Sequence, residues 1–186
     1  MIVFDIETDG LNPSKIHCLS YTSDGVEHNT LTDYEDMRQL LSDQKGLIGH
    51  NIVRYDVPVL ERILGIKIKA RLYDTLPMSW VMNYDRTKPH GLASFGEDFG
   101  IPKPVVTDWS EQPVEVYVHR CEEDIKINWK LWQNLLKRFM FVYKDKKNLD
   151  KFFGYLSFKM NCAYAAEHVG WKLDVDLASH CVDTLT

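Results

Sequence analysis

Apolar residues in the first half of the chain recur at two spacings. Positions that alternate with a period of two predict strands, and positions three or four residues apart predict helices. The expected order is strands at residues 2–7, 16–22 and 26–31, a helix from Asp33, a strand at 46–49, a helix closed by Gly65, a strand at 71–73, and helices at 75–83 and 91–99. Three leading strands followed by alternating helices and strands predict an α/β fold, with a mixed sheet that begins as a three-strand meander and is flanked by helices.

The second half of the chain is predicted to be helical. A long helix is expected to begin between Ser110 and Pro113 and to end near Phe139, because apolar residues four apart form a stripe along it. A second amphipathic helix is expected at residues 153–170, and a further helix from about Val175. Apolar helices at the end of a domain need a surface that covers them, so we expect a partner there.

Positive charge is concentrated between the two predicted helices. Residues 137–159 include seven Lys and Arg but only two Asp and Glu. We interpret residues 141–152 as a basic linker, which is either solvated or faces phosphate. The predicted organisation is therefore a domain at 1–140, this linker, and a helical tail at 153–186.

The composition is typical of a globular protein with a hydrophobic core, since 45% of the 186 residues are hydrophobic and 26% are charged. We expect neither a membrane-spanning helix nor a signal peptide. The four cysteines are scattered without the spacing of a zinc site, which favours a reducing, cytoplasmic environment. The net charge of −5 argues mildly against a broad basic face that coats duplex nucleic acid.

The first predicted strand carries a pair of acids, Asp5 and Glu7, in an otherwise apolar run. Residues i and i+2 of a strand point to the same face, so both carboxylates are expected on one side. Two adjacent like charges are costly unless a cation lies between them, and hard divalent cations prefer carboxylate oxygens. The pair alone leaves two interpretations open, a metal site and a solvated strand end.

Two further acids occupy positions where mechanistic groups are expected. Asp56 follows a short strand at a helix N-terminus, and Asp124 lies in the long helix beside the apolar Ile125 and Ile127. Four acids on separate elements can hold two divalent ions, which activate a water and stabilise the leaving oxygen of a phosphodiester. Mg²⁺ or Mn²⁺ are the expected ions.

Three motifs together resemble the DnaQ-like 3′→5′ exonucleases of the RNase H-like fold. Residues 5–11 (Asp-Ile-Glu-Thr-Asp-Gly-Leu) match the family's Asp-x-Glu-Thr-x-Gly-Leu, and residues 50–56 (His-Asn-Ile-Val-Arg-Tyr-Asp) match its His-Asn-x-x-x-aromatic-Asp. The third motif is the segment that ends at Asp124. Residues 74–76 and 90–100 also resemble the proofreading domains of family A DNA polymerases, in particular those of short-tailed phages.

The resemblance implies roles for individual residues. Asp5 would bridge two ions, Glu7 and Asp124 would complete the site of the ion that carries the attacking water, and Asp56 would serve the second ion largely through water. Four more would contact the substrate: Thr8 and Leu11 at the terminal nucleotide, and Asn51 and Tyr55 along the strand path. For Asn51 and Tyr55 a role in packing or in the turn is the alternative.

The third motif departs from the polymerase pattern, because Arg120 stands where those domains usually have Tyr. The other branch of the family has His five residues before the last Asp, and here that residue is His119. We therefore predict His119 as the general base. Residues five apart differ by about 140° on a helix, so His119 reaches the site only from a loop or a distorted turn. In an unbroken helix, Arg120 would face the metals instead.

The resemblance implies a two-metal 3′→5′ exonuclease that acts on single-stranded or frayed DNA 3′ ends. The expected context is the proofreading module of a phage polymerase, with the polymerase domain in the same chain or in a separate subunit and the host cytoplasm as location. The tail at 153–186 resembles the start of a polymerase thumb. Two alternatives remain, an RNA or oligonucleotide exonuclease of the same fold and an inactive domain that braces a polymerase.

Overall fold

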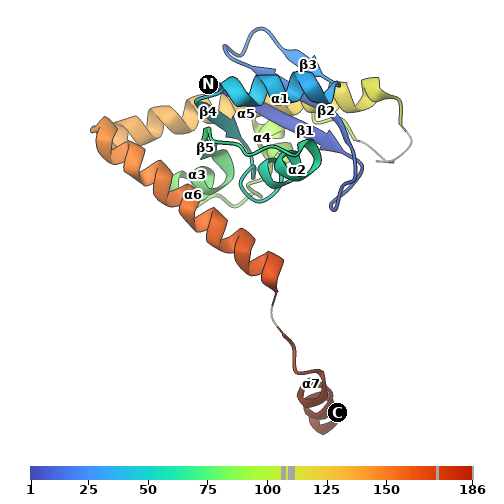
Figure 1. The fold of residues 1–186 in the computed structure, drawn as a ribbon. Coiled ribbons are helices and arrows are strands. Elements are labelled where there is room, and N and C mark those ends of the chain that lie inside the picture. The colour runs from blue at the N-terminus through green and yellow to red at the C-terminus, as the bar shows by residue number, and fades with distance from the viewer. Residues whose placement is uncertain (106–107, 109–111, 171, 186) are drawn as a thin grey trace.

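A five-stranded mixed sheet forms the centre of the protein (Figure 1). The computed structural model describes residues 1–105, 108, 112–170 and 172–185. The strands lie in the order β3-β2-β1-β4-β5, with β1 antiparallel to β2 and parallel to β4. Their bounds are Ile2–Thr8 (β1), Ile16–Thr22 (β2), Asn29–Leu31 (β3), Gly46–Gly49 (β4) and Arg71–Asp74 (β5). The predicted α/β fold with a leading three-strand meander is confirmed.

Seven helices follow or separate the strands within the described residues. They are Tyr34–Asp43 (α1), Asp56–Leu64 (α2), Thr75–Met82 (α3), Leu92–Phe99 (α4), Val114–Tyr143 (α5), Lys146–Val169 (α6) and Val175–Leu185 (α7). The alternation along β1 divides the core into two layers. Phe4 and Ile6 pack with α1 and α2 on one face of the sheet, whereas Val3 packs with α3, α4 and α5 on the other.

Several element boundaries differ from the sequence expectation. β3 is only three residues long, since pairing with β2 begins at Asn29 rather than at residue 26. The long helix α5 begins after Pro113 and continues to Tyr143, beyond the expected end at Phe139. The predicted start at Ser110 lies outside the described residues.

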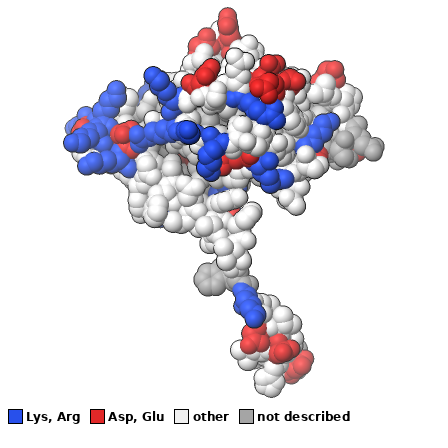
Figure 2. Space-filling view, in the orientation of Figure 1, with Lys and Arg blue, Asp and Glu red and all other residues white. Residues whose placement is uncertain are grey.

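We expected a linker at residues 141–152, but most of these residues lie in the helices α5 and α6. Only Lys144 and Asp145 lie between α5 and α6. The Asp145 side chain accepts a hydrogen bond of 2.9 Å from the backbone N–H of Lys147, so it caps α6 at its start. Figure 2 shows that Lys and Arg gather at this corner of the molecule. The division into domains at 1–140 and 153–186 stays a prediction.

The two C-terminal helices differ in how they contact the body. Leu156 and Met160 of α6 are buried, and Ser157 donates a hydrogen bond of 3.0 Å to the carbonyl of Leu72 on β5. In contrast, α7 has no buried residue and lies apart from the sheet in Figure 1. Among the described residues, no helix has the length and apolar character needed to cross a membrane.

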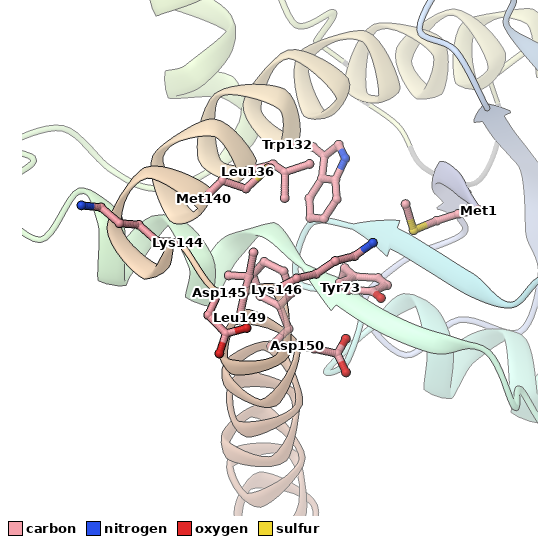
Figure 3. Close-up of a pocket in the computed structure, with 11 residues that line it drawn as sticks. Met1, Tyr73, Trp132, Leu136, Met140, Lys144, Asp145, Lys146, Leu149 and Asp150 are labelled. Carbon is pink, nitrogen blue, oxygen red and sulfur yellow. The ribbon is translucent and has the colours of Figure 1, made fainter.

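A pocket of about 400 Å³ lies where α5 meets α6 (Figure 3). Its lining is mainly apolar and includes Tyr73 of β5, Trp132 and Leu136 of α5, and Leu149 of α6. Four charged residues also line it: Lys144 and Asp145 between the two helices, and Lys146 and Asp150 on α6. Charged side chains therefore border an apolar interior.

Candidate metal centre

The central strand β1 carries the first two acids of the site. Asp5 and Glu7 lie two residues apart, and both line the same cavity, as the alternation of a strand predicts. Glu7 is buried and Asp5 is partly buried. Both residues pair with β2, Asp5 opposite Ser20 and Glu7 opposite Cys18, which fixes the backbone from which the two side chains project.

Asp56 is placed by a turn that another acid holds. It is the first residue of α2, and the preceding turn contains Asn51 in a left-handed conformation with φ of 64°. Asp74 accepts hydrogen bonds from the backbone N–H groups of Asn51 (2.8 Å) and Val53 (3.2 Å). It also caps α3, because its side chain accepts a hydrogen bond of 3.0 Å from the N–H of Leu76.

The helix α5 supplies the fourth acid, Asp124, whose residue surface is only 2% exposed. It reaches a cavity of about 210 Å³ that all four acids line. The complete lining is Asp5, Ile6, Glu7, His50, Asn51, Tyr55, Asp56, Leu92, Lys103, Arg120 and Asp124. Three motifs that are far apart in the sequence therefore converge on one cavity.

The donor atoms of this cavity fit a divalent cation. Asp5, Glu7 and Asp124 each offer a carboxylate oxygen, and the three oxygens lie within 4.8 Å of one another. The Oδ1 atom of Asp124 is buried and has no hydrogen-bond partner among the residues that the structure describes. A buried, unpaired carboxylate oxygen costs free energy that a hard cation would offset.

The surroundings of the cavity raise the pKa values of its carboxyl groups. Burial is the main factor that raises the pKa of Asp5 well above its ordinary value, and the charges of Asp124 and Asp56 add to it. Burial raises the pKa of Asp56 to about 8 and that of Glu7 to about 7. Like charges in a poorly solvated space shift carboxyl pKa values upward, and a bound divalent ion reverses this effect.

Two side-chain cations contact the carboxylates. Lys103 Nζ forms an ion pair with Asp124 Oδ2, and Arg120 Nε donates a hydrogen bond of 2.9 Å to Glu7 Oε1. Arg120 also donates to the carbonyl of Pro104, so it ties the loop that carries Lys103 to α5. Sequence reasoning missed Lys103, because a lysine between two prolines in a loop has no spacing that links it to a distant helix.

The predicted position of His119 is wrong. The helix α5 is regular from Val114, so His119 stands on neither a loop nor a distorted turn. His119 is exposed, because residues five apart on a helix, such as His119 and Asp124, differ in direction by about 140°. Arg120 contacts Glu7 instead. This is the arrangement expected for an unbroken helix.

The predicted substrate residues surround a second cavity, of about 290 Å³, next to the acids. It is lined by Ile6, Glu7, Thr8, Gly10, Leu11 and Tyr55. The hydroxyl groups of Thr8 and Tyr55 lie 2.6 Å apart, and Tyr55 donates to the Gly10 carbonyl at 2.5 Å. Leu11 is 94% exposed, so it presents an apolar side chain to solvent at the rim. Asn51 lines the acidic cavity instead.

Among the residues that the sequence did not single out for the site, His50 also lines the acidic cavity. Its Nδ1 lies 2.9 Å from the Thr75 hydroxyl oxygen. Burial, followed by the charge of Lys103, lowers the pKa of His50 to about 3, so the ring is neutral near neutral pH. It adds no further positive charge to the two cations already present.

No protein-family model and no curated protein matches this sequence. Solved structures do. Brucella melitensis NrnC bound to pGG matches with a TM-score of 0.67 and 20% identity over 91% of this chain and 85% of that chain. Exonuclease X in complex with 5′ overhanging duplex DNA matches with a TM-score of 0.52 and 11% identity over 84% and 98%. The family B DNA polymerase of Pyrobaculum calidifontis matches with a TM-score of 0.58 and 14% identity over 73% and 24%.

A second NrnC structure, with bound Mg²⁺, matches with a TM-score of 0.64 and 19% identity over 87% of this chain and 83% of that chain. At these identities the matches establish the fold and leave the substrate open. On this fold, the acids of β1, the first residue of α2 and Asp124 of α5 line one cavity. The chain thus has an RNase H-like fold, which it shares with NrnC and Exonuclease X, and an acidic triad, Asp5, Glu7 and Asp124, suited to a metal ion.

Proposed function

We propose that this protein is a 3′→5′ exonuclease that depends on two divalent ions, Mg²⁺ or Mn²⁺. The observation that carries the proposal is the convergence of four carboxylates from β1, α2 and α5 on one cavity, with an unpaired Asp124 oxygen inside it. NrnC, which shares the fold, is seen with bound Mg²⁺, and this supports the choice of ion.

In this proposal each acid holds a defined position. Asp5, Glu7 and Asp124 would hold the ion that activates the attacking water, and Asp5 and Asp56 would hold the second ion, Asp56 largely through water. Two divalent ions in such a cavity lower the pKa of a water and stabilise the leaving oxygen of a phosphodiester. With the two ions, the cavity changes from an excess of negative to an excess of positive charge, which attracts the substrate phosphate.

The neighbouring cavity would bind the terminal nucleotide. Thr8 and Tyr55 provide hydroxyl groups at its base, and the exposed Leu11 provides an apolar edge against which a splayed base packs. Asn51, which lines the acidic cavity, would contact the strand as it enters. A single-stranded or frayed end fits this arrangement, because the cavity would have to admit a splayed terminal nucleotide.

The proton acceptor is the part of the mechanism that departs from the prediction. We propose that the two ions and Glu7 govern deprotonation of the water, and that His119, exposed on α5, has at most a secondary role. Substitution of His119 by Ala is then expected to lower kcat by less than about tenfold, which is below the usual contribution of a general base. A loss of a thousandfold at unchanged fold would restore His119 as the base.

We propose DNA 3′ ends as the substrate, in a proofreading role beside a polymerase domain. The motif resemblance to phage family A polymerases supports this, as does the match to about a quarter (24%) of a polymerase chain. A second candidate is an exonuclease of RNA or short oligonucleotides, favoured by the match to NrnC bound to pGG. Rates on matched DNA and RNA strands of equal length and sequence would separate the two.

The decisive experiment is hydrolysis of a 5′-labelled oligonucleotide with Mg²⁺ or Mn²⁺, compared between the wild-type protein and Asp5→Ala. Stepwise release of mononucleotides from the 3′ end by the wild type alone is the expected result. Equal rates for the two proteins would contradict the proposal. Absence of hydrolysis by both would favour the inactive bracing domain.

A further inference from the structure

A groove of about 810 Å³ runs between the loop after β1, the helix α2 and the helix α6. It is continuous with the acidic site through shared lining residues. The acidic cavity and the nucleotide cavity share Ile6, Glu7 and Tyr55, and the nucleotide cavity and the groove share Leu11 and Tyr55. Tyr55 lines all three, so the strand on the 5′ side of a phosphate held at the carboxylates can enter the groove while the terminal nucleotide occupies the nucleotide cavity.

The α2 side of the groove is lined by basic residues. Arg54 lies just before α2, Arg62 lies on it and Lys67 follows it, and one acid of α2, Glu61, also lines the groove. Arg62 donates a hydrogen bond of 2.7 Å to the carbonyl of Pro13, which fixes its guanidinium at the groove wall. Lys67 pairs with Glu61 at 2.6 Å, yet its side chain is 78% exposed and stays accessible to a phosphate.

The α6 side adds aromatic rings. Tyr164 and His168 lie four residues apart on one face of the helix, and their rings stack with centroids 5.0 Å apart. A basic wall opposite aromatic rings is the arrangement by which proteins hold single strands without reading their sequence, because phosphates meet cations and bases stack on rings.

An ion pair crosses the groove. Arg54 Nε donates a hydrogen bond of 3.0 Å to Glu167 Oε2, and a second contact joins its Nη2 to Oε1. Glu167 is more than half exposed. A partly exposed ion pair is weak, so a phosphate can replace Glu167 as the partner of Arg54.

We propose that this groove binds the nucleic-acid strand upstream of the terminal nucleotide, and that Arg54 exchanges Glu167 for a strand phosphate when it does so. The inference rests on the proposed exonuclease function and adds a second binding site to it, whose far wall is α6. The strand is single-stranded and is bound without sequence preference. Affinity therefore depends on strand length, since only strands that extend several nucleotides upstream of the scissile phosphate reach α6.

The test is binding of labelled oligothymidylates of two and ten nucleotides, by fluorescence anisotropy with Mg²⁺, in an Asp5→Asn background that prevents hydrolysis. Adding Arg54→Met or Tyr164→Ala is expected to weaken binding of the ten-nucleotide strand at least fivefold, with less than a twofold change for the dinucleotide. Glu167→Gln, which releases Arg54, is expected to tighten binding of the longer strand about threefold. Lys159→Met, on α6 outside the groove lining, is the matched charge control and leaves both affinities unchanged.

Equal changes for both lengths, or no change with Arg54→Met and Tyr164→Ala, would overturn the groove. Weaker binding with Glu167→Gln would also overturn the exchange of partners. Loss of binding of both strands in the Asp5→Asn background alone would count against the groove and the proposed function together. If the wild-type protein failed to hydrolyse either strand while the length-dependent differences persisted, the proposed function would be wrong and the groove would stand.

Discussion

The helix α5 lines both the acidic cavity and the apolar pocket at the α5–α6 corner, but the side chains that it contributes to the two differ in polarity. The helix α5 contributes Asp124 to the first and Trp132 and Leu136 to the second. The apolar pocket is larger, about 400 Å³ against 210 Å³, and of the two acids at its edge Asp150 pairs with Arg71 and Asp145 caps α6. In the acidic cavity the Oδ1 of Asp124 has no hydrogen-bond partner within the described part of the chain. The state of the polar atoms, rather than size, therefore identifies the site.

The largest difference between the two regions is expected in the hydrolysis rate when one Asp in each region is replaced by Asn. Asp124→Asn removes a metal ligand, so the rate of 3′ hydrolysis is expected to fall at least about a thousandfold, since the ions supply several kcal/mol of transition-state stabilisation. Asp150→Asn breaks only a partly exposed ion pair with Arg71 and is expected to leave the rate unchanged. Single-turnover kinetics at saturating Mg²⁺ measure both, and a comparable loss in the two variants would remove the distinction.

For the free energy of unfolding, we expect the larger effect from a substitution in the apolar pocket. Trp132 is 4% exposed and packs against Tyr73 and Phe153, with ring centroids 5.6 Å and 6.2 Å away. Trp132→Ala is expected to lower the free energy of unfolding by about 3–5 kcal/mol, because a large buried ring is lost and a cavity remains. The hydrolysis rate per folded molecule should stay within about twofold of the wild type. Urea denaturation gives the first quantity, and activity well below the midpoint gives the second.

The site acids were predictable because their signals are local. The alternation of β1 assigned Asp5 and Glu7 to one face, and the strand–turn–helix pattern placed Asp56 at the start of α2. Both follow from periods that a short stretch of sequence contains. The fold class followed in the same way from the order of strands and helices.

The features that sequence reasoning missed depend on long-range contacts or on a single cap. Lys103 meets Asp124 only because the loop after α4 returns to α5, and no periodicity specifies such a return. The start of α6 was placed seven residues too late, because the lysine-rich segment suggested a solvated linker and the capping by Asp145 was overlooked. His119 was assigned from a family pattern, but the β-branched residues at the start of α5 did not interrupt the helix.

The pH dependence of stability should also differ between the regions. The pKa of Asp56 is raised to about 8 and that of Asp5 is raised as well, so between pH 4 and 8 the folded state holds protons that the unfolded chain releases. The free energy of unfolding of the metal-free protein must therefore fall as pH rises through this range. Its Tm is expected to decrease by several degrees from pH 5.5 to pH 8.

Calorimetry with EDTA and with Mg²⁺ tests this expectation. Mg²⁺ binds the ionised carboxylates, so it should stabilise the protein more at pH 8 than at pH 5.5. Asp56→Asn should flatten the metal-free profile, whereas Asp150→Asn, at the edge of the apolar pocket, should leave it unchanged. A metal-free Tm that rises with pH would contradict the raised pKa values.

The smallest effect is expected from substitution of Lys103, which lines the acidic cavity. Its Nζ occupies Asp124 Oδ2, so a metal ion must displace it before Asp124 can serve fully as a ligand. Lys103→Met removes the competitor and is expected to lower the Mn²⁺ concentration for half-saturation about three- to tenfold, measured by titration calorimetry without nucleic acid. Lys126→Met, which breaks a pair with Glu123 on the same helix, makes the same change in net charge outside the cavity and serves as the control. Weaker Mn²⁺ binding by Lys103→Met would mean that Lys103 orients Asp124 for the ion rather than competing with it.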